Sequence, residues 1–467
     1  MTKSILLFRN DLRCFDNEAL SEALTCKECY PVFIYDQSYT RDLGEASVLW
    51  LYHALKSLDQ DLKECLSFFN GDYQEIILNL VQKHSITDVY LDRTYEHGLD
   101  IGDQELAVKL KEIKCELHIF HQRTLWDITQ ILKGDQTPYK VFTPFFKRGC
   151  LEEAEPERPV EKPVIDNLVK FNESEDLSEV ISLSKLEWTS SIIKQWDISE
   201  NGAQVLWKNF LSNGLDYYKE GRNFPNKDYV SRLSPYIRFG QISVRQLYHD
   251  VQAHGSSSNH YHFISELGWR EFSYYLLYHF PTFKQDNFQS KFDKFPWKFD
   301  ESLYKAWCKG KTGYPIIDAG MRELYQTGYI HNRPRMICGS FLVKNLLIHW
   351  SHGEKWFWDC LFDADFANNV AGWQWVAGTG ADAAPYFRIF NPMLQGSKFD
   401  PTGEYIKTYV PELKEMPLKY LNAPWEAPVS VLQEANIVLG KDYPRPIVNF
   451  KESREVALEA FRSIKGE

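Results

Sequence analysis

The chain has 467 residues, of which 44% are hydrophobic and 25% are charged. This composition is typical of a globular protein and excludes collagen-like, coiled-coil and wholly disordered classes. The length is about three times that of a common ~150-residue domain, so at least two domains are expected. The sequence shows neither a secretory signal nor an apolar run long enough to cross a membrane, and we therefore expect a cytoplasmic protein without membrane association.

The net charge of −11 is distributed unevenly along the chain. Residues 1–200 hold 22 basic and 36 acidic side chains, whereas residues 201–467 hold 31 and 28. The first part is therefore strongly acidic, and only the second part leaves room for a basic face that could bind an anionic partner.

Nine cysteines are present, an odd number in a chain without a secretory signal, which favours reduced thiols over a disulfide framework. Cys26 and Cys29 form a single CxxC motif. No second pair of Cys or His with the spacing of metal ligands lies nearby, so a chance occurrence is favoured over a zinc or redox role. No metal is expected.

Short apolar runs alternate with amphipathic stretches over the first 125 residues. The runs predicted as strands are residues 5–8, 31–35, 88–91 and 117–120, and the predicted helices include residues 47–66 and 104–113. This alternation predicts an α/β N-terminal domain with a doubly wound parallel sheet over residues 1–126. Residues 9–13 stand where a G-x-G-x-x-G motif would follow the first strand, which disfavours classical NAD binding.

Residues 127–202 contain several prolines in an acid-rich stretch with weak periodicity, and we expect them to form an interdomain connector over the surface. From residue 203 onward the periodicity becomes helical. The predicted helices there are residues 205–210, 243–252, 262–277, 317–325, 336–350 and 355–361. The sequence therefore predicts an all-α C-terminal domain over residues 203–467.

Two pairs of charged residues in the C-terminal part stand where a charge needs a partner. Arg333 and Arg335 lie at the entrance of a predicted helix, a position suited to pairing with carboxylate or phosphate, although taken alone a surface ion pair is the simpler interpretation. Asp363 and Asp365 lie in an apolar stretch and require a partner, for which Arg335 is the candidate. Metal binding there would need further ligands.

Glu266 and Trp269 are three residues apart in a predicted helix and share a face. Such a pair could hold a base by hydrogen bonding and stacking, but a core tryptophan beside a solvated glutamate is an equally good interpretation. Trp350, Trp373 and Trp375 lie close in sequence to the two aspartates. Indole is readily oxidised by one electron, so these rings could carry electrons as well as fill a core.

Several longer blocks occur in one order over nearly the whole chain. They are residues 8–13, 231–234, 312–322, 331–336, 363–365 and 368–375. These blocks resemble the signature motifs of the photolyase/cryptochrome family. Within that family the chain most resembles class I cyclobutane pyrimidine dimer (CPD) DNA photolyases.

The resemblance implies a noncovalent FAD in the helical domain, above a cavity that receives a flipped-out dimer. The positions that match the family's cofactor site are Tyr218, Val230, Ser231, Arg232, Leu233, Ser234, Phe263, Arg270, Asn332, Arg335, Asp363, Ala364, Asp365 and Asn369. Tyr218 and the turn 231–234 would hold the phosphates and adenosine, and Asn369 would face the N5 edge of the flavin. Val230 departs from the pattern, because the family often has a hydroxyl residue there.

The resemblance also implies residues for electron transfer, catalysis and DNA binding. Trp373, Trp350 and Trp297 match a photoreduction chain, from the flavin outward. Glu266, Trp269 and Asn369 match catalytic positions. The positions that match DNA contacts are Arg222, Glu266, Trp269, Asn332, Arg333, Met336 and Gln395.

The predicted activity is that of a deoxyribodipyrimidine photo-lyase, in which excited reduced FAD donates an electron to the dimer, the cyclobutane ring splits and the electron returns. The alternative is a cryptochrome-like blue-light photoreceptor with the same FAD and Trp chain, and the Glu266 and Trp269 pair favours repair. A flavin-free interaction protein would require the motifs to be relics. Asn332 stands where 6-4 photolyases tend to have a second His, and Asn369 where plant cryptochromes tend to have Asp.

An antenna chromophore is expected in the N-terminal domain, with methenyltetrahydrofolate first and a deazaflavin second. Lys284 fits a folate-site position, whereas Gly98 and Leu99 provide neither the amide nor the carboxylate that a folate-binding relative would offer. The expected partner is DNA that contains pyrimidine dimers, bound by a monomer that would be associated with the nucleoid in a bacterial cell.

Overall fold

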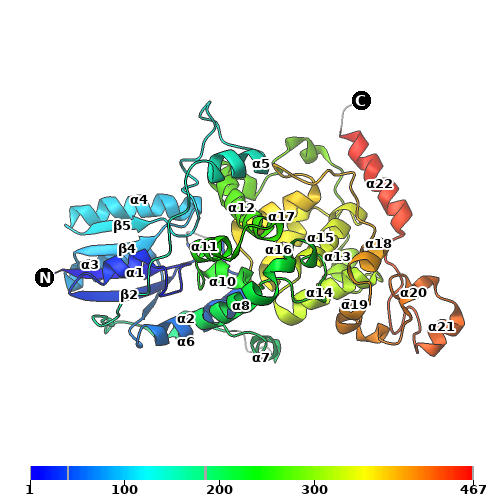
Figure 1. The fold of residues 1–467 in the computed structure, drawn as a ribbon, viewed down its shortest axis with the longest axis horizontal. Helices are drawn as coiled ribbons and strands as arrows, with labels where there is room; N and C mark the ends of the chain where they lie inside the picture. The colour runs from blue at the N-terminus through cyan, green and yellow to red at the C-terminus, as the bar shows by residue number, and fades with distance from the viewer. Residues whose placement is uncertain (1, 39–40, 184–186, 465–467) are drawn as a thin grey trace. The chain divides into compact units, whose positions relative to one another are not determined.

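The structure is a computed structural model that describes residues 2–38, 41–183 and 187–464 (Figure 1). The chain forms two compact units. The first unit combines Met1–Asn213 with Ser231–Pro281, and the second combines Gly214–Val230 with Thr282–Glu467. The short segment Gly214–Val230 thus belongs to the second unit, although the first unit flanks it on both sides in sequence.

Five parallel strands form the sheet of the first unit, in the order β3-β2-β1-β4-β5. They are β1 (Lys3–Phe8), β2 (Glu28–Tyr35), β3 (Ser67–Asn70), β4 (Asp88–Asp92) and β5 (Glu116–Phe120). The four predicted strands and the doubly wound parallel arrangement are confirmed. The sequence does not predict β3, because only two of its four residues, Phe68 and Phe69, are apolar.

Helices cover the sheet and continue the first unit (Figure 1). They are α1 (Glu18–Ala23), α2 (Glu45–Asp61), α3 (Tyr73–His84), α4 (His97–Glu112), α5 (Phe142–Pro144), the π-helical turn η1 (Phe145–Leu151), α6 (Leu177–Val180), α7 (Glu187–Ile193), α8 (Glu200–Asn213), α10 (Ser234–Phe239), α11 (Val244–His254) and α12 (Ser258–His279).

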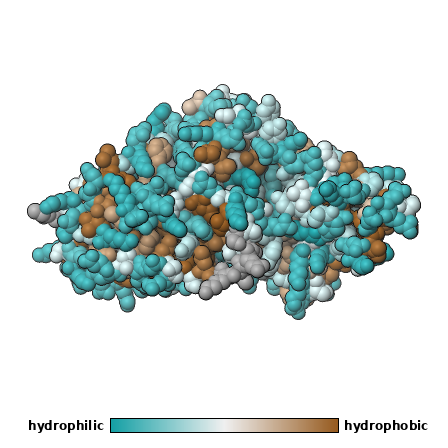
Figure 2. Space-filling view, turned by 90° about the horizontal axis from the view of Figure 1, so that it is seen from below, coloured by the Kyte–Doolittle hydropathy of each residue, from teal (hydrophilic) through white to brown (hydrophobic). Residues whose placement is uncertain are grey.

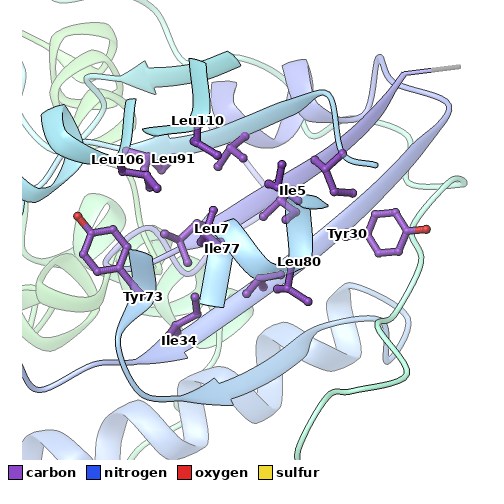
Figure 3. Close-up of a cluster of buried hydrophobic side chains, with 14 of the residues drawn as sticks. Ile5, Leu7, Tyr30, Ile34, Tyr73, Ile77, Leu80, Leu91, Leu106 and Leu110 are labelled. Carbon is purple, nitrogen blue, oxygen red and sulfur yellow. The ribbon is translucent and has the colours of Figure 1, made fainter. Parts of the chain in front are cut away.

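The core of the first unit joins the sheet to α3 and α4 (Figure 3). Its buried side chains include Ile5, Leu7, Ile34, Leu91, Ile77, Leu80, Leu106 and Leu110. Ile5 and Leu7 share one face of β1 because successive strand residues alternate between faces. Leu6 and Phe8 on the other face are also fully buried, as expected for a parallel sheet covered on both sides.

The carboxyl edge of the sheet is filled by the chain's own polar side chains. The strand order turns at β1 and β4, where doubly wound sheets usually bind a ligand. The buried polar residues there are Asp11, Arg13, Asp92, Thr94, Gln122 and Arg123. Burial, together with repulsion from Asp11, raises the pKa of Asp92 to about 7.

The segment α10–α12 is hydrogen-bonded to the loop that follows β1 at the carboxyl edge of the sheet. The backbone N–H of Leu12 donates to the carbonyl of Phe239 at 3.1 Å, and Arg13 donates to the carbonyl of Gly240 at 3.1 Å. Gly240 has a φ of 71°, and a Cβ there would lie 2.0 Å from the backbone oxygen of Asn10. Glycine is therefore required for this close approach.

The second unit consists of helices and loops, in agreement with the all-α fold class predicted for the C-terminal part. Of the predicted domain 203–467, residues 203–213 and 231–281 belong to the first unit. Its elements are η2 (Leu215–Tyr217), α9 (Tyr218–Gly221), η3 (Pro281–Lys284), η4 (Ser290–Lys294), α13 (Glu301–Cys308), α14 (Pro315–Thr327), α15 (Asn332–Ser340), η5 (Phe341–Asn345), α16 (Trp350–Cys360), α17 (Phe366–Ala377), α18 (Pro392–Phe399), α19 (Glu404–Tyr409), η6 (Pro411–Leu413), α20 (Leu418–Leu421), η7 (Pro424–Glu426), α21 (Val429–Glu434) and α22 (Phe450–Ser463).

The helix predicted over residues 336–350 is wrong in one respect, because the structure breaks it. α15 passes into the π-helical turn η5, Leu347 has a φ of 54°, and a new helix begins at Trp350 with His349 as its N-cap. Residues 337–348 are all buried. The polar residues of this stretch, Ser340, Lys344 and Asn345, are spaced like one face of a helix and so give no signal of the break, although all three are buried.

Hydrophilic residues dominate the face shown in Figure 2, with hydrophobic residues scattered among them. In the described part of the chain, no helix combines the length and the apolar character needed to span a bilayer.

Candidate functional site

The residues predicted to bind cofactor, lesion and DNA, and those predicted to transfer electrons, are divided between the two units. The first unit carries Ser231, Arg232, Leu233, Ser234, Phe263, Glu266, Trp269 and Arg270. The second unit carries Tyr218, Arg222, Val230, Trp297, Asn332, Arg333, Arg335, Met336, Trp350, Asp363, Ala364, Asp365, Asn369, Trp373 and Gln395.

Helix α12 presents Glu266 and Trp269 on one face, because the helix is continuous between them. Both side chains are half-buried. The Glu266 carboxylate lies 3.8 Å from Nε2 of His262, one turn earlier. The indole of Trp269 stacks on Phe142, with ring centroids 3.8 Å apart and an interplanar angle of 11°.

Two further predicted residues on α12 have well-defined partners. Phe263 is buried against Trp207 and Phe210 of α8, with ring centroids 5.5 and 5.3 Å away. Arg270 donates to Glu271 at 2.9 Å. Phe263 is thus packed in the core of the first unit, and Arg270 is held by an acidic neighbour that the sequence reasoning missed.

Glu271 links α12 to the loop that follows β5. Its carboxylate is completely buried and accepts from the backbone N–H of Leu125 at 2.8 Å. Burial raises the pKa of Glu271 to about 7, and the Arg270 cation opposes this shift. A buried carboxylate held by a cation and a backbone donor is a strong structural restraint.

The predicted turn at residues 231–234 leads into α10, whose first residue is Ser234. The hydroxyl of Ser231 accepts from the backbone N–H of Leu233 at 3.4 Å. Arg232 has a φ of 54°, and its guanidinium lies 4.7 Å from the ring centroid of Trp196. The turn therefore exposes Arg232, buries Leu233, and leaves Ser231 and Ser234 half-buried.

In the second unit, Arg335 of α15 pairs with Asp363, which confirms the partner predicted from the sequence. Nη2 of Arg335 lies 3.0 and 2.9 Å from the two carboxylate oxygens. Asp365 has another role, because its Oδ1 accepts from the N–H of Asn368 at 2.9 Å and caps α17. Ala364 between them is buried.

Asn369 is buried on the first turns of α17, and its amide is fixed by Glu354 of α16. Nδ2 donates to Oε1 of Glu354 at 2.8 Å and to the Glu354 backbone carbonyl at 3.1 Å. Both bonds use the amide nitrogen, so the orientation of the amide is set by its neighbour. The sequence reasoning missed Glu354, which lies fifteen positions from Asn369.

Arg222 and Arg333 lie over aromatic rings. The Arg222 guanidinium is 5.4 Å from the ring centroid of Tyr218, and that of Arg333 is 4.2 Å from Phe399. Arg333 also donates to Asn223. Burial, reinforced by the nearby Arg222 cation, lowers the pKa of Arg333.

His331 caps α15 among these arginines. Its Nδ1 accepts from the backbone N–H of Arg333 at 3.1 Å, and the ring is buried. Burial lowers the pKa of His331 to about 3, with further contributions from Arg222, Arg333 and Arg335. The ring is therefore neutral at physiological pH.

The remaining predicted DNA contacts lie on α15 and α18. Asn332 is exposed, and its Nδ2 lies 3.8 Å from the sulfur of Met336. Met336 and Gln395 are half-buried.

The three predicted electron-transfer tryptophans are held in different ways. Trp373 lies in a notch of α16, where a Cβ on Gly353 would come within 2.1 Å of its ring. Trp350 is buried and donates to Asn287 at 2.8 Å. His349 lies between Trp350 and Trp297, with ring centroids 5.2 and 5.1 Å away.

Trp307 is an additional indole beside Trp373. Their ring centroids are 6.0 Å apart at 69°, and Trp307 is fully buried. Nothing in the sequence points to Trp307, because it lies outside the motif blocks and no spacing rule connects it to Trp373.

The polar and aromatic side chains described above for the second unit fit a flavin. An isoalloxazine ring presents carbonyl oxygens and ring nitrogens along its edge, which call for a cation, an amide and neighbouring aromatic rings. Arg335, with its charge balanced by Asp363, and Asn369, fixed by Glu354, supply the polar groups. Trp373 lies on the same helix as Asn369, one turn later.

The residues considered for an antenna are placed differently. Gly98 is exposed, and Leu99 packs against the core of the first unit. Lys284 lies in η3 and is half-buried. The Leu99 side chain therefore serves the interior of the first unit.

Known proteins match both parts of the chain. The family model of the FAD binding domain of DNA photolyase matches residues 263–463, and that of DNA photolyase matches residues 4–164. The deoxyribodipyrimidine photo-lyase of Agrobacterium fabrum is 41% identical over 99% of this chain and 98% of its own length. Cryptochrome-1 of Arabidopsis thaliana is 32% identical over 98% of this chain and 70% of its own length.

A solved structure agrees with these matches. The crystal structure of a bacterial class III photolyase from Agrobacterium tumefaciens has a TM-score of 0.95 at 40% identity, covering 100% of this chain and 98% of the other. The comparisons confirm the family, the FAD-binding domain and the prediction of an enzyme, but they do not support class I specifically. The chain belongs to the DNA photolyase family.

Proposed function

We propose that this protein repairs cyclobutane pyrimidine dimers in DNA by light-driven electron transfer. The observation that carries the proposal is the face of α12 on which the Glu266 carboxylate and the Trp269 indole stand together. An acceptor of hydrogen bonds and a stacking ring are the two contacts that a flipped-out base requires. The relative named deoxyribodipyrimidine photo-lyase supports this substrate.

Reduced FAD, when bound, supplies the electron that opens the cyclobutane ring and takes it back. We assign Asn369 to the N5 edge of the flavin, because Glu354 occupies Nδ2 and so determines where Oδ1 points. A neutral amide offers a hydrogen bond without adding negative charge. Arg335, paired with Asp363, is assigned to the flavin edge.

The other proposed cofactor contacts come from the positions that match the family pattern. They are Tyr218, Val230, Ser231, Arg232, Leu233, Ser234, Phe263, Arg270, Asn332, Ala364 and Asp365. Trp373, Trp350 and Trp297 are assigned to the reduction of oxidised FAD by light, with Trp373 nearest the flavin.

DNA binding is assigned to a small local set of residues. Arg222, Arg333 and Gln395 match positions near the DNA backbone. Glu266, Trp269 and Met336 match positions that contact the dimer, and Asn332 matches a further DNA position. Phosphate contacts position a protein on DNA, and the cavity then selects the lesion. We expect a monomer in the cytoplasm, associated with the nucleoid if the cell is bacterial.

An antenna chromophore remains part of the proposal, with methenyltetrahydrofolate first and a deazaflavin second. The carboxyl edge of the sheet is filled by Asp11, Asp92, Arg13 and Arg123. This packing supports an antenna site elsewhere. The absorption spectrum of the purified protein after denaturation and release of its chromophores identifies the antenna.

The second candidate function is a cryptochrome-like photoreceptor, which the similarity to Cryptochrome-1 of Arabidopsis thaliana favours. Both functions need FAD, but only repair needs the Glu266 and Trp269 pair. Light-dependent loss of dimers from an irradiated oligothymidine, measured with chemically reduced protein, distinguishes them. Glu266→Ala with Trp269→Ala should abolish that loss while FAD absorbance is retained.

A further inference from the structure

Trp269 does not stand on α12 as an isolated ring. Phe142 lies nearly parallel to it at a centroid distance of 3.8 Å, and Phe272 meets it edge-on at 6.0 Å and 73°. One face of the indole is therefore covered by Phe142. The part of the half-buried indole that stays exposed lies on the other face and the edges.

Phe142 is in turn stacked on Phe146, with centroids 5.3 Å apart and an angle of 12°. Phe146 approaches α12 where Gly268 leaves room, because a Cβ on Gly268 would lie 2.5 Å from the Phe146 ring. Gly268 immediately precedes Trp269. The missing side chain at this position allows the stacked rings to lie against the helix.

Tyr275 fastens the segment that carries Phe142 to α12. Its buried hydroxyl accepts from the backbone N–H of Tyr139 at 2.8 Å and donates to the carbonyl of Ile131 at 2.9 Å. Phe142 is therefore ordered by contacts within the first unit, and its ring is already in place when a ligand arrives.

We propose that Phe142 is a positioning residue that holds the Trp269 indole in one orientation and thereby sets the plane on which a pyrimidine dimer stacks. This inference rests on the proposed function, in which Trp269 receives the dimer. An indole without this support would sample several orientations, and binding would have to select one of them at a cost in affinity. Phe142 would thus affect discrimination between damaged and undamaged DNA without touching DNA.

A packing role alone has different consequences. Loss of a core ring would lower the stability of the first unit, and any effect on DNA binding would be the same whether or not Trp269 is present. A positioning role acts only through Trp269, so its effect disappears when the indole is removed.

The test is a double-mutant cycle with full-length, FAD-loaded protein. Dissociation constants are measured for a single-stranded oligonucleotide with one thymine dimer and for the same oligonucleotide without it. Phe142→Leu and the conservative Phe142→Tyr are each made with Trp269 intact and with Trp269→Ala. Phe171→Leu is the matched control, because Phe171 is a buried ring of the same unit that stacks on Tyr30 and contacts Phe69.

Phe142→Leu should weaken dimer binding roughly two- to tenfold, the range of an aromatic pair contact, and leave undamaged DNA unaffected. Phe142→Tyr should bind like the unchanged protein. In the Trp269→Ala background, Phe142→Leu should have no further effect. With Trp269 intact, Phe171→Leu should lower the melting temperature without changing discrimination. If Phe142→Leu does not fold, Phe142→Met is measured in its place.

Two results separate the possible failures. If Trp269→Ala abolishes discrimination but Phe142→Leu does not reduce it, or reduces affinity equally in both backgrounds, Phe142 has no positioning role. If Trp269→Ala itself leaves discrimination unchanged, the proposed lesion site is wrong, and the inference is overturned with it.

Discussion

His331 shows how its surroundings set the charge of a single side chain. The ring is buried at the N-cap of α15 with Arg222, Arg333 and Arg335 around it, and its pKa is lowered from 6.5 to about 3. The unfolded chain therefore takes up a proton below about pH 6.5, whereas the folded protein does so only near pH 3. Folding stability contributed by this group is fully present above the unfolded pKa and decreases as the pH falls below it.

We expect His331→Asn to remove this pH dependence while keeping an N-cap acceptor, since asparagine is a good capping residue. Between pH 7.5 and 5.0 the unchanged protein should lose about 2 kcal/mol more unfolding free energy than the variant, at about 1.4 kcal/mol per pH unit below 6.5. Urea unfolding at the two pH values measures the difference. Identical losses would show that His331 is not held neutral.

Glu271 is a second residue whose environment can be tested. Its removal leaves Arg270 and the backbone N–H of Leu125 without the carboxylate that they share. Breaking such a buried ion pair should reduce the unfolding free energy by about 3–5 kcal/mol in Glu271→Ala. Glu271→Gln, which keeps an acceptor, should lose less.

Glu301→Ala is the control for Glu271→Ala, because it breaks an exposed ion pair between Glu301 and Lys305 on α13. This change should be nearly neutral, since exposed ion pairs contribute little. Equal effects of the two substitutions in urea unfolding would contradict the assigned role of Glu271.

At the scale of elements, α16 carries Trp350, and α17 carries Trp373 together with Asn369, whose amide is held by Glu354. Trp297→Phe keeps an aromatic ring but removes the outermost oxidisable indole. Light-driven reduction of oxidised FAD, followed by flavin absorbance, should slow sharply, while dimer repair by chemically reduced protein should persist.

Trp307→Phe is the matched comparison for this chain, because Trp307 lies 6.0 Å from Trp373 outside the predicted path. If electrons follow Trp297, Trp350 and Trp373, this change should leave photoreduction nearly unaffected. If Trp297→Phe reduces FAD in light at the unchanged rate and Trp307→Phe reduces it slowly, the electrons pass through Trp307 and not through Trp297.

Patterns along the chain predict elements better than they predict partners. Periodicity predicts four of the five strands, and charge within an apolar stretch predicts the pairing of Arg335 with Asp363. The break at Leu347 escapes prediction because the polar residues before it, Ser340, Lys344 and Asn345, keep a helical spacing. Glu354, Phe142 and Trp307 escape for another reason: their partners are brought close by tertiary packing, which leaves no local signal in one sequence.

At the scale of the whole molecule, a net charge of −11 is unfavourable for binding a polyanion through a general field. Affinity for DNA should depend on a few local phosphate contacts. Each phosphate contact contributes about 0.9 to the slope of log affinity against log salt for duplex DNA.

Arg333→Ala should weaken damaged and undamaged duplexes alike and make this slope shallower by about one unit. Trp269→Ala should remove discrimination and leave the slope unchanged, with a loss of about 1–3 kcal/mol per stacked base. Arg462→Ala, which removes one exposed cation from α22, is the control for net charge and should change neither quantity. If Arg333→Ala and Trp269→Ala behave alike across a salt series, positioning and lesion recognition are not separate functions.

The central claim is light-driven repair of cyclobutane dimers, and its most direct measurement is the loss of dimers from a defined oligonucleotide. The purified protein with reduced FAD is mixed with DNA that contains one thymine dimer, and with DNA that contains one 6-4 product, in blue light and in the dark. We expect intact thymines to appear only with the dimer substrate and only in light. Absence of light-dependent repair of the dimer by protein that holds reduced FAD would contradict the claim and favour a photoreceptor.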